Sequence, residues 1–213
     1  IKSEGLRVLA RELAALGQVT VFAPSTNYSG AGAAIGHIGP GLPDIFESSR
    51  DKFARCDGAY HFDGAPALAT MLACTGLFGW CPDVVVSGIN LGWNVGHSVH
   101  FSGTIGACVT ADVFDVPTIA ISQPVASPDA PQLWSTAAEV AASLVPDVLE
   151  TRQLLNVNVP NISVDQIAGL QVTRLGGRSY GESVREEISD SGKQYKIDRN
   201  VPITSDAGEG TDI

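Results

Sequence analysis

The chain has 213 residues, of which 44% are hydrophobic and 17% charged, and this is typical of a globular protein with a full core. Its formal net charge of −10 argues against duplex nucleic acid as the main partner, because binding to phosphate backbones depends on Lys and Arg. No apolar run approaches the ~20 residues that a membrane-spanning helix needs, and no signal peptide opens the chain, so we expect no membrane association.

The cysteine pattern indicates a reducing environment. No two of the four cysteines form a C-x-x-C pair, and one of them falls on the apolar face of a predicted helix. We therefore expect a cytoplasmic protein with buried free thiols, rather than disulfides or a zinc site. The four residues are Cys56, Cys74, Cys81 and Cys108.

Helices and strands alternate through most of the chain, which predicts a doubly wound α/β fold. Ser3 can cap the first helix, and Pro66 stands in the first turn of the second, where a missing N–H costs little. A strand would normally precede such a first helix, so we expect that a strand is missing from the N-terminus of this sequence. In chain order we predict a helix over residues 3–16, strands over 18–23 and 60–62, a helix over 65–74, and no element over 35–57.

A βαβ unit is expected at the centre of the chain. It consists of a buried strand over residues 84–86, a helix over 103–113 and a strand over 118–122. The loop after its first strand is far longer than the usual connection of about 2–6 residues, and it would lie at the carboxyl ends of the strands, where ligands bind. The elements that follow are a helix over 132–145, which Pro146 ends or bends, and a strand over 154–159 with one polar face.

The residue types of this long loop favour an anion site. Asn and Ser side chains supply neutral hydrogen-bonding groups, and Gly lets backbone N–H groups approach a ligand. Ser102 is placed to cap the helix that begins near Gly103, whose first N–H groups attract negative charge. Because no Lys or Arg occurs between Arg55 and Arg152, an anion must be held by dipoles, hydroxyl groups or a metal ion. The alternative is that the loop is only a tight turn and Ser102 only a cap.

The last part of the chain, from residue 169 onward, differs in character from the rest. Strand pieces over residues 170–175, 184–188 and 194–197, separated by Gly, predict a protruding β-hairpin arm. Such an arm often pairs with another subunit, although a solvated surface sheet would give the same pattern. Six of the thirteen basic residues belong to it: Arg174, Arg178, Arg185, Lys193, Lys196 and Arg199.

A series of motifs runs in order through nearly the whole chain. They are Ile1 with Gly5-Leu6 and Leu9, Val21-Phe22-Ala23-Pro24 with Asn27-Tyr28-Ser29-Gly30, Ser87-Gly88-Ile89-Asn90 with Gly92, Asn94 and Gly96, Ser102-Gly103-Thr104, residues 117–122 and 156–160, and Gly210-Thr211-Asp212. In these motifs the chain resembles the SurE family of stationary-phase survival proteins, which are metal-dependent 5'/3'-nucleotidases. The Ser-Gly-Ile-Asn and Ser-Gly-Thr elements are the specific ones.

The resemblance implies a site for a divalent cation and a phosphate group. The family holds its cation with two consecutive aspartates, a serine and an asparagine, and the last two are matched by Ser29 and Asn90. The aspartates would precede Ile1, so either the sequence is part of a longer polypeptide or the protein is a truncated, metal-poor relative. Mg²⁺ or Mn²⁺ is the implied ion. The phosphate site is matched by Asn94, Ser102, Gly103 and Thr104, with Asn94 and Ser102 as the implied catalytic residues.

The resemblance also implies a fold, an assembly and a reaction. The fold is a Rossmann-like α/β core over residues 1–168, with a mostly parallel sheet and helices on both faces, and a C-terminal hairpin extension over 169–213 that contacts other subunits in a homodimer or homotetramer. The reaction is hydrolysis of nucleoside 5'-monophosphates, with 3'-monophosphates as further candidates, to nucleoside and phosphate. The alternative is a catalytically silent relative that binds phosphate or a nucleotide. A Rossmann dehydrogenase is disfavoured, because no G-x-G-x-x-G motif follows Val86.

Overall fold

The computed structural model describes residues 3–36, 44–48, 53, 55–125, 127, 130–177, 181–189, 192–201 and 208–212. The chain divides into two compact units. The first consists of Ile1–Asn94 and His100–Gly169, and the second of Val95–Val99 and Leu170–Ile213.

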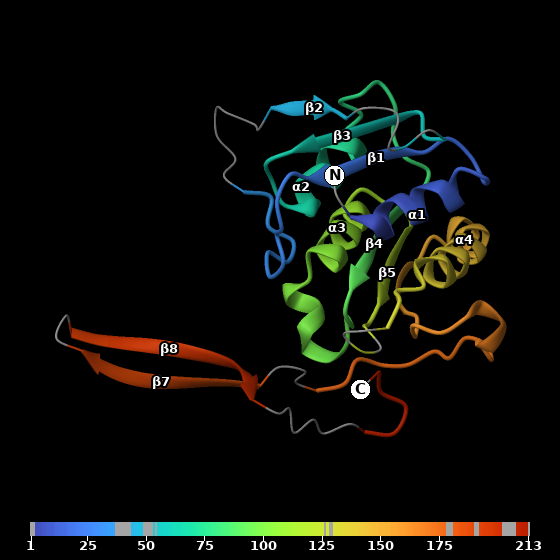
Figure 1. The fold of residues 1–213 in the computed structure, drawn as a ribbon. Helices are drawn as coiled ribbons and strands as arrows, with labels where there is room; N and C mark the ends of the chain where they lie inside the picture. Colours follow the sequence, from blue (N-terminus) through green and yellow to red (C-terminus); the bar gives the residue numbers. More distant parts are fainter. Residues whose placement is uncertain are drawn as a thin grey trace. The chain divides into compact units, whose positions relative to one another are not determined.

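Helices and strands alternate along the first unit, as the sequence pattern predicts (Figure 1). The helices are α1 (Glu4–Leu13), α2 (Pro66–Cys74), α3 (Gly103–Asp112) and α4 (Trp134–Thr151), and the 3-10 turns are η2 (Gly96–Phe101), whose residues are shared between the units, and η3 (Val164–Gln166). The strands are β1 (Thr20–Pro24), β2 (Ile45–Glu47), β3 (Gly58–Phe62), β4 (Val85–Leu91), β5 (Thr118–Gln123) and β6 (Leu154–Asn158). Among the helices that the structure describes, none is both long and apolar enough to cross a lipid bilayer.

The described strands of the first unit form two three-stranded sheets. In one sheet β1 is parallel to β3, and β2 is antiparallel to β3 on its other side. In the other sheet β4, β5 and β6 run parallel in that order. Pairing is therefore mostly parallel and the α/β prediction is confirmed. β2 lies within residues 35–57, where no element is predicted, because its residues are held by pairing with β3 rather than by a local signal.

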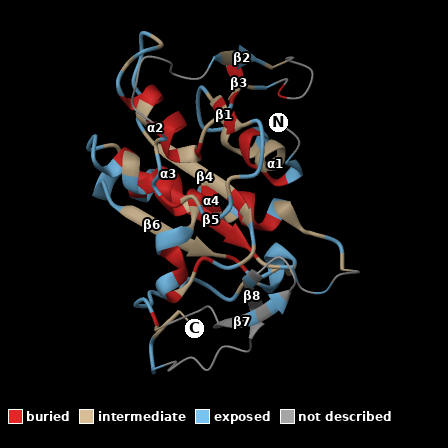
Figure 2. Ribbon diagram, turned by 90° about the vertical axis from the view of Figure 1, so that its left-hand side faces the viewer, coloured by how far each residue is buried: buried red, intermediate tan, exposed pale blue. Residues whose placement is uncertain are grey.

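Helices cover both faces of the β4–β5–β6 sheet, with α1 and α4 on one face and α3 on the other. α1 packs against α4, and α2 packs against α3. Ile119 and Ile121 of β5 belong to apolar clusters with the buried face of α4. Cys108 of α3 lies beside Thr118, which alternates with Ile119 and so points to the other face. Figure 2 shows the buried residues concentrated in β5 and in the helices packed on it.

Helix α4 continues beyond Pro146 to Thr151, so the predicted end near residue 145 is wrong. Val145 and Val148, on either side of the proline, are buried against Ile119, and this packing offsets the hydrogen bond that proline cannot donate. The helix ends at Arg152, which has a left-handed conformation with φ of 54°.

The second unit contains the predicted hairpin, in which β7 (Gly181–Ser189) pairs antiparallel with β8 (Gly192–Val201). Lys193 Nζ lies 2.8 Å from Glu186 Oε1 across the two strands. The strand predicted over residues 170–175 is wrong: only Arg174 forms an isolated bridge there, with Thr211, and Val172 is 98% exposed, so its side chain finds no apolar face to cover. Several predicted basic residues of the arm lie outside the described residues. They are Arg178 and, for their side chains, Arg185, Lys196 and Arg199.

Candidate active site at the carboxyl ends of the strands

A bulge near the end of β4 places Asn90 at the carboxyl edge of its sheet. Ser87 pairs with Ala120, whereas Asn90 pairs with Ser122, so β4 carries one residue more than β5 over this stretch. The backbone of Gly88 approaches β5 so closely that a Cβ atom there would lie 2.4 Å from the Ile121 carbonyl oxygen. Only glycine fits at this position.

The side chain of Asn90 is partly used within its own loop. Its Nδ2 donates a hydrogen bond to the Gly92 carbonyl oxygen at 3.1 Å. Since the amide nitrogen is engaged in this way, Oδ1 is the atom that Asn90 would offer to a cation.

Asn94 is buried, with 4% of its surface exposed, and is fixed by side chains from β5 and β6. Its Nδ2 donates to Ser122 Oγ at 2.7 Å. Its main-chain N–H donates to Asn158 Oδ1 at 2.9 Å, and its carbonyl oxygen accepts from Nδ2 of Asn158 at 2.9 Å and from Nδ2 of Asn156 at 2.8 Å. These bonds use one of the two hydrogens on the side-chain amide of Asn94, and the other is available to a ligand.

Ser102 caps helix α3, which confirms that part of the prediction. Its backbone is extended, with φ of −77° and ψ of 123°, and its Oγ accepts from the Ile105 N–H at 3.3 Å. Gly103 and Thr104 form the start of the first turn, whose N–H groups have no acceptor within the helix. These groups and the helix dipole give the position affinity for a phosphate oxygen.

The loop that carries Ser29 packs directly on the start of α3. The Gly32 N–H donates to the Phe101 carbonyl oxygen at 3.1 Å. A Cβ atom on Gly106 would lie 2.1 Å from the Gly32 carbonyl oxygen, and one on Gly103 would lie 3.7 Å from that of Tyr28. Because Gly106 has no side chain, the loop after β1 can lie against the helix, which brings the loop of Ser29 to residues 102–104.

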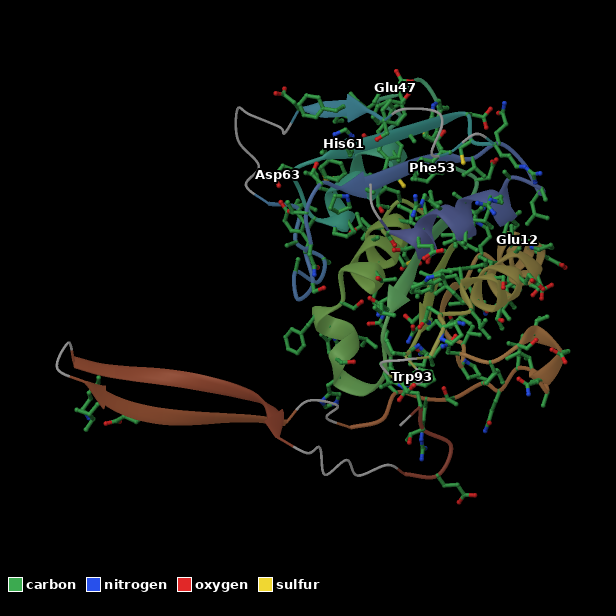
Figure 3. All side chains as sticks on the ribbon, viewed as in Figure 1. Glu12, Glu47, Phe53, His61, Asp63 and Trp93 are labelled. Atoms are coloured by element: carbon green, nitrogen blue, oxygen red, sulfur yellow. The ribbon has the colours of Figure 1, made fainter. Side chains whose placement is uncertain are left out.

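Three hydrogen bonds to side-chain oxygens set the conformation of this loop. The Ser29 N–H and hydroxyl both donate to Asn27 Oδ1, at 2.8 and 2.6 Å. The Tyr28 hydroxyl donates to Asp63 Oδ1 at 2.6 Å, and Figure 3 shows Asp63 just beyond the end of β3. The hydrogen bond to Asp63, together with desolvation and the carboxylate charge, raises the pKa of Tyr28.

The residues of this chain do not complete a divalent-cation site by themselves. Within the part of the chain that the structure describes, no group of three or more His, Cys, Asp or Glu side chains is placed to hold a metal ion. The two predicted ligands, Ser29 and Asn90, are both neutral, whereas hard cations in proteins are usually held by carboxylates. The Ser29 hydroxyl donates its hydrogen to Asn27 Oδ1, which leaves its oxygen lone pairs as the groups that it would offer to a cation.

Within the second unit, Asp212 ties together three stretches of the chain. Its Oδ2 accepts from the Gly96 N–H at 3.0 Å, and its Oδ1 accepts from the Gly176 N–H at 2.6 Å. The neighbouring His97 N–H donates to the Gly177 carbonyl oxygen at 3.0 Å. These bonds give the predicted Gly-Thr-Asp motif a structural role in the second unit.

Two groups of predicted residues are thus brought together, one around Asn90 and Asn94 and one around Ser29 and Ser102. Their binding roles remain predictions. Sequence reasoning missed the residues that hold Asn94, although the alternation of Asn with apolar residues along β6 was a signal for them. It also missed the bond between Tyr28 and Asp63, for which the only sequence signal was that each follows a predicted strand.

Comparisons with known proteins find similar sequences and a similar structure along nearly the whole chain. The family model described as Survival protein SurE matches residues 1–182. The chain is 38% identical to the 5'-nucleotidase SurE of Legionella pneumophila (strain Paris), over 100% of this chain and 81% of the relative. It is 35% identical to the 5'-nucleotidase SurE of Mannheimia succiniciproducens, over 99% and 82%. The crystal structure of the SurE protein from Aquifex aeolicus matches with a TM-score of 0.76 and 31% identity, over 99% of this chain and 83% of that one. The chain belongs to the SurE family.

Proposed function

We propose that this chain is a 5'-nucleotidase, which hydrolyses nucleoside 5'-monophosphates to a nucleoside and inorganic phosphate. The observation that carries the proposal is the similarity of essentially the whole chain to relatives named 5'-nucleotidase SurE, at 35–38% identity in the two compared above. The capped helix terminus and the buried Asn94 supply groups that suit a phosphate ester.

The chain's own part in the reaction is to bind and orient the phosphoryl group. Phosphoryl oxygens accept hydrogen bonds from the Gly103 and Thr104 N–H groups and lie at the positive end of the α3 dipole. Asn94 offers its remaining amide hydrogen. In hydrolysis the oxygen of water bonds to phosphorus and the bond from phosphorus to the ribose oxygen breaks. Neutral donors held in fixed positions stabilise the charge that develops on the phosphoryl oxygens.

Dependence on a divalent cation belongs to the same proposal, with Mg²⁺ or Mn²⁺ as the expected ion. Ser29 and Asn90 would contribute neutral oxygen ligands, but these two do not suffice to hold a hard cation without carboxylates. Phosphate release should stop on addition of EDTA and return with Mg²⁺ or Mn²⁺. Cleavage of 3'-monophosphates and assembly into a homodimer or homotetramer through the arm are further predictions, tested by a substrate panel and by light scattering after gel filtration.

The test of the binding site compares two serines that make the same helix cap. Ser102 accepts from the Ile105 N–H at 3.3 Å, and Ser3 accepts from the Leu6 N–H at 3.3 Å at the start of α1. Loss of either cap costs about 1 kcal/mol of stability. We expect Ser102→Ala to reduce phosphate release from 5'-AMP strongly and Ser3→Ala to leave it unchanged. Equal activity of the two variants would show that Ser102 has no role in phosphate binding. Binding of a nucleotide without any release of phosphate would favour a catalytically silent relative.

A further inference from the structure

We propose that Asn158 and Asn156 are positioning residues, which fix the main chain of Asn94 so that its side-chain amide is held toward the phosphoryl group. The inference rests on the proposed function, because it concerns how Asn94 is presented to the substrate. Neither asparagine was among the predicted site residues, and we assign neither of them contact with the substrate.

The first observation is that Asn158 binds both main-chain groups of Asn94. Its Oδ1 accepts from the Asn94 N–H and its Nδ2 donates to the Asn94 carbonyl oxygen, each at 2.9 Å. Asn94 lies beyond the end of β4, so it has no ladder partner, and the amide of Asn158 takes the place of one. A carboxylate has no hydrogen to donate and an apolar side chain has neither a donor nor an acceptor, so neither could make both bonds.

The second observation is that Asn156 binds the same main-chain oxygen of Asn94 while its own side-chain oxygen is unpaired. Its Nδ2 donates to the same Asn94 carbonyl oxygen at 2.8 Å. Its Oδ1 is buried and has no hydrogen-bond partner among the described residues. A buried acceptor without a donor destabilises the fold. The Asn94 carbonyl oxygen thus accepts from Asn156 as well as from Asn158, and two donors on one oxygen fix the direction of that carbonyl group.

The third observation is that the side chain of Asn94 is oriented by the same row of the sheet. Asn90 pairs with Ser122 in β5, and Ser122 pairs with Asn158 in β6. The Ser122 side chain is fully buried, and its Oγ accepts from Asn94 Nδ2 at 2.7 Å. One row of paired residues thus fixes the main chain and the side chain of Asn94 together, and the remaining amide hydrogen has a defined direction.

The polar residues lie on one face of β6 only. Leu155 and Val157, which alternate with the two asparagines, pack in the apolar core with α4. The asparagines therefore face away from that core, toward the side on which Asn94 is held. One face of β6 therefore packs in the apolar core, and the other face holds Asn94.

The experiment measures kcat and KM for 5'-AMP in variants of Asn158 and in a matched control. Asn161 makes the same kind of two-bond clamp on main-chain groups other than those of Asn94, accepting from the Leu133 N–H at 2.8 Å and donating to the Pro131 carbonyl oxygen at 3.0 Å. We expect Asn158→Ala to lower kcat roughly 10- to 100-fold with little change in KM, because misplacement of a group that stabilises the transition state acts mainly on kcat. Asn161→Ala should lower the melting temperature without lowering kcat.

A double-mutant cycle distinguishes positioning from general destabilisation. If Asn158 acts through Asn94, Asn158→Ala should lower kcat no further in a protein that already carries Asn94→Ala. Additive losses would overturn the inference, as would an Asn158→Ala protein with the kcat of Asn161→Ala. If Asn158→Ala does not fold, Asn158→Asp, which keeps the acceptor for the Asn94 N–H, and Asn156→Ala answer the same question. Failure of the unaltered protein to release phosphate would instead contradict the proposed function.

Discussion

The hydroxyl of Tyr28 donates to Oδ1 of Asp63 at 2.6 Å and so links the loop after β1 to the residue that follows β3. Since the Tyr28 carbonyl oxygen also lies against Gly103, this bond holds the loop of Ser29 in place beside the start of α3. Tyr28 and Asp63 are 35 positions apart in the sequence, and they meet because β1 and β3 are paired side by side.

Removal of the Asp63 acceptor should lower the pKa of Tyr28. The hydrogen bond and the carboxylate charge both favour the neutral phenol, so the pKa of Tyr28 is raised above its usual value, and Asp63→Ala should bring it back toward that value. The stability that the bond adds is present below the pKa of an unfolded tyrosine, about 10, and is lost as the pH rises through the raised pKa. Absorbance titration of the phenol near 295 nm measures the change, with Tyr28→Phe to assign the signal. An unchanged titration in Asp63→Ala would contradict the bond.

A methyl group on Gly106 should destabilise the protein and displace the loop of Ser29. The Cβ of Gly106→Ala would lie 2.1 Å from the Gly32 carbonyl oxygen, which is main chain and has little room to move. We expect a loss of about 1–3 kcal/mol in the free energy of unfolding, measured with urea.

The control for this prediction is Gly17→Ala. Among the described residues, and apart from Gly17 and its two chain neighbours, no atom lies within 4 Å of the Cβ position at Gly17, so this substitution should change stability by much less. Equal stability of the two variants would show that α3 and the loop are not in the close contact described.

The sequence predicts features of this fold that depend on neighbours along the chain. The apolar periodicity of α1 and α3 and the cap at Ser102 are local, and each is confirmed. The end of α4 is not local, because burial of Val145 and Val148 against Ile119 carries the helix through Pro146. β2 likewise depends on its partner β3, and no pattern within its own three residues reveals it.

The same distinction applies to the candidate site. Ser102, Gly103 and Thr104 are readable from the chain, because a cap and a first turn are contiguous. The hydrogen bonds from Asn158 to Asn94 cannot be read from the chain in this way. Asn158 lies 64 positions further on and is brought back by the β4–β5–β6 register. Among the described residues, no group of three or more His, Cys, Asp or Glu side chains is placed to hold a cation, so the motifs predict a cation site that these residues do not complete.

The four thiols should differ in reactivity toward Ellman's reagent at pH 8. Cys81 is exposed and should react first, whereas Cys74 and Cys108 are buried. Burial raises the pKa of Cys74 to about 11 and that of Cys108 to about 12, so neither forms appreciable thiolate at this pH. Cys81→Ser should abolish the fastest phase, and Cys108 should react only after unfolding in guanidinium chloride. A fast phase that persists in Cys81→Ser would contradict the described burial.

Trp93 should contribute to binding of the nucleobase. Three aromatic side chains differ in their surroundings: Trp80 stacks on Phe78, Tyr28 is tied to Asp63, and Trp93 is 50% exposed beside Asn94, beyond the end of β4 (Figure 3). Stacking of a base on an aromatic ring contributes about 1–3 kcal/mol, so Trp93→Ala should raise KM for 5'-AMP roughly tenfold while leaving KM for glycerol 2-phosphate, which has no base, unchanged. Trp80→Ala is the control and should change neither KM. An equal rise in KM for both substrates would instead indicate that Trp93 supports the phosphate site, and no rise at all would place the base elsewhere.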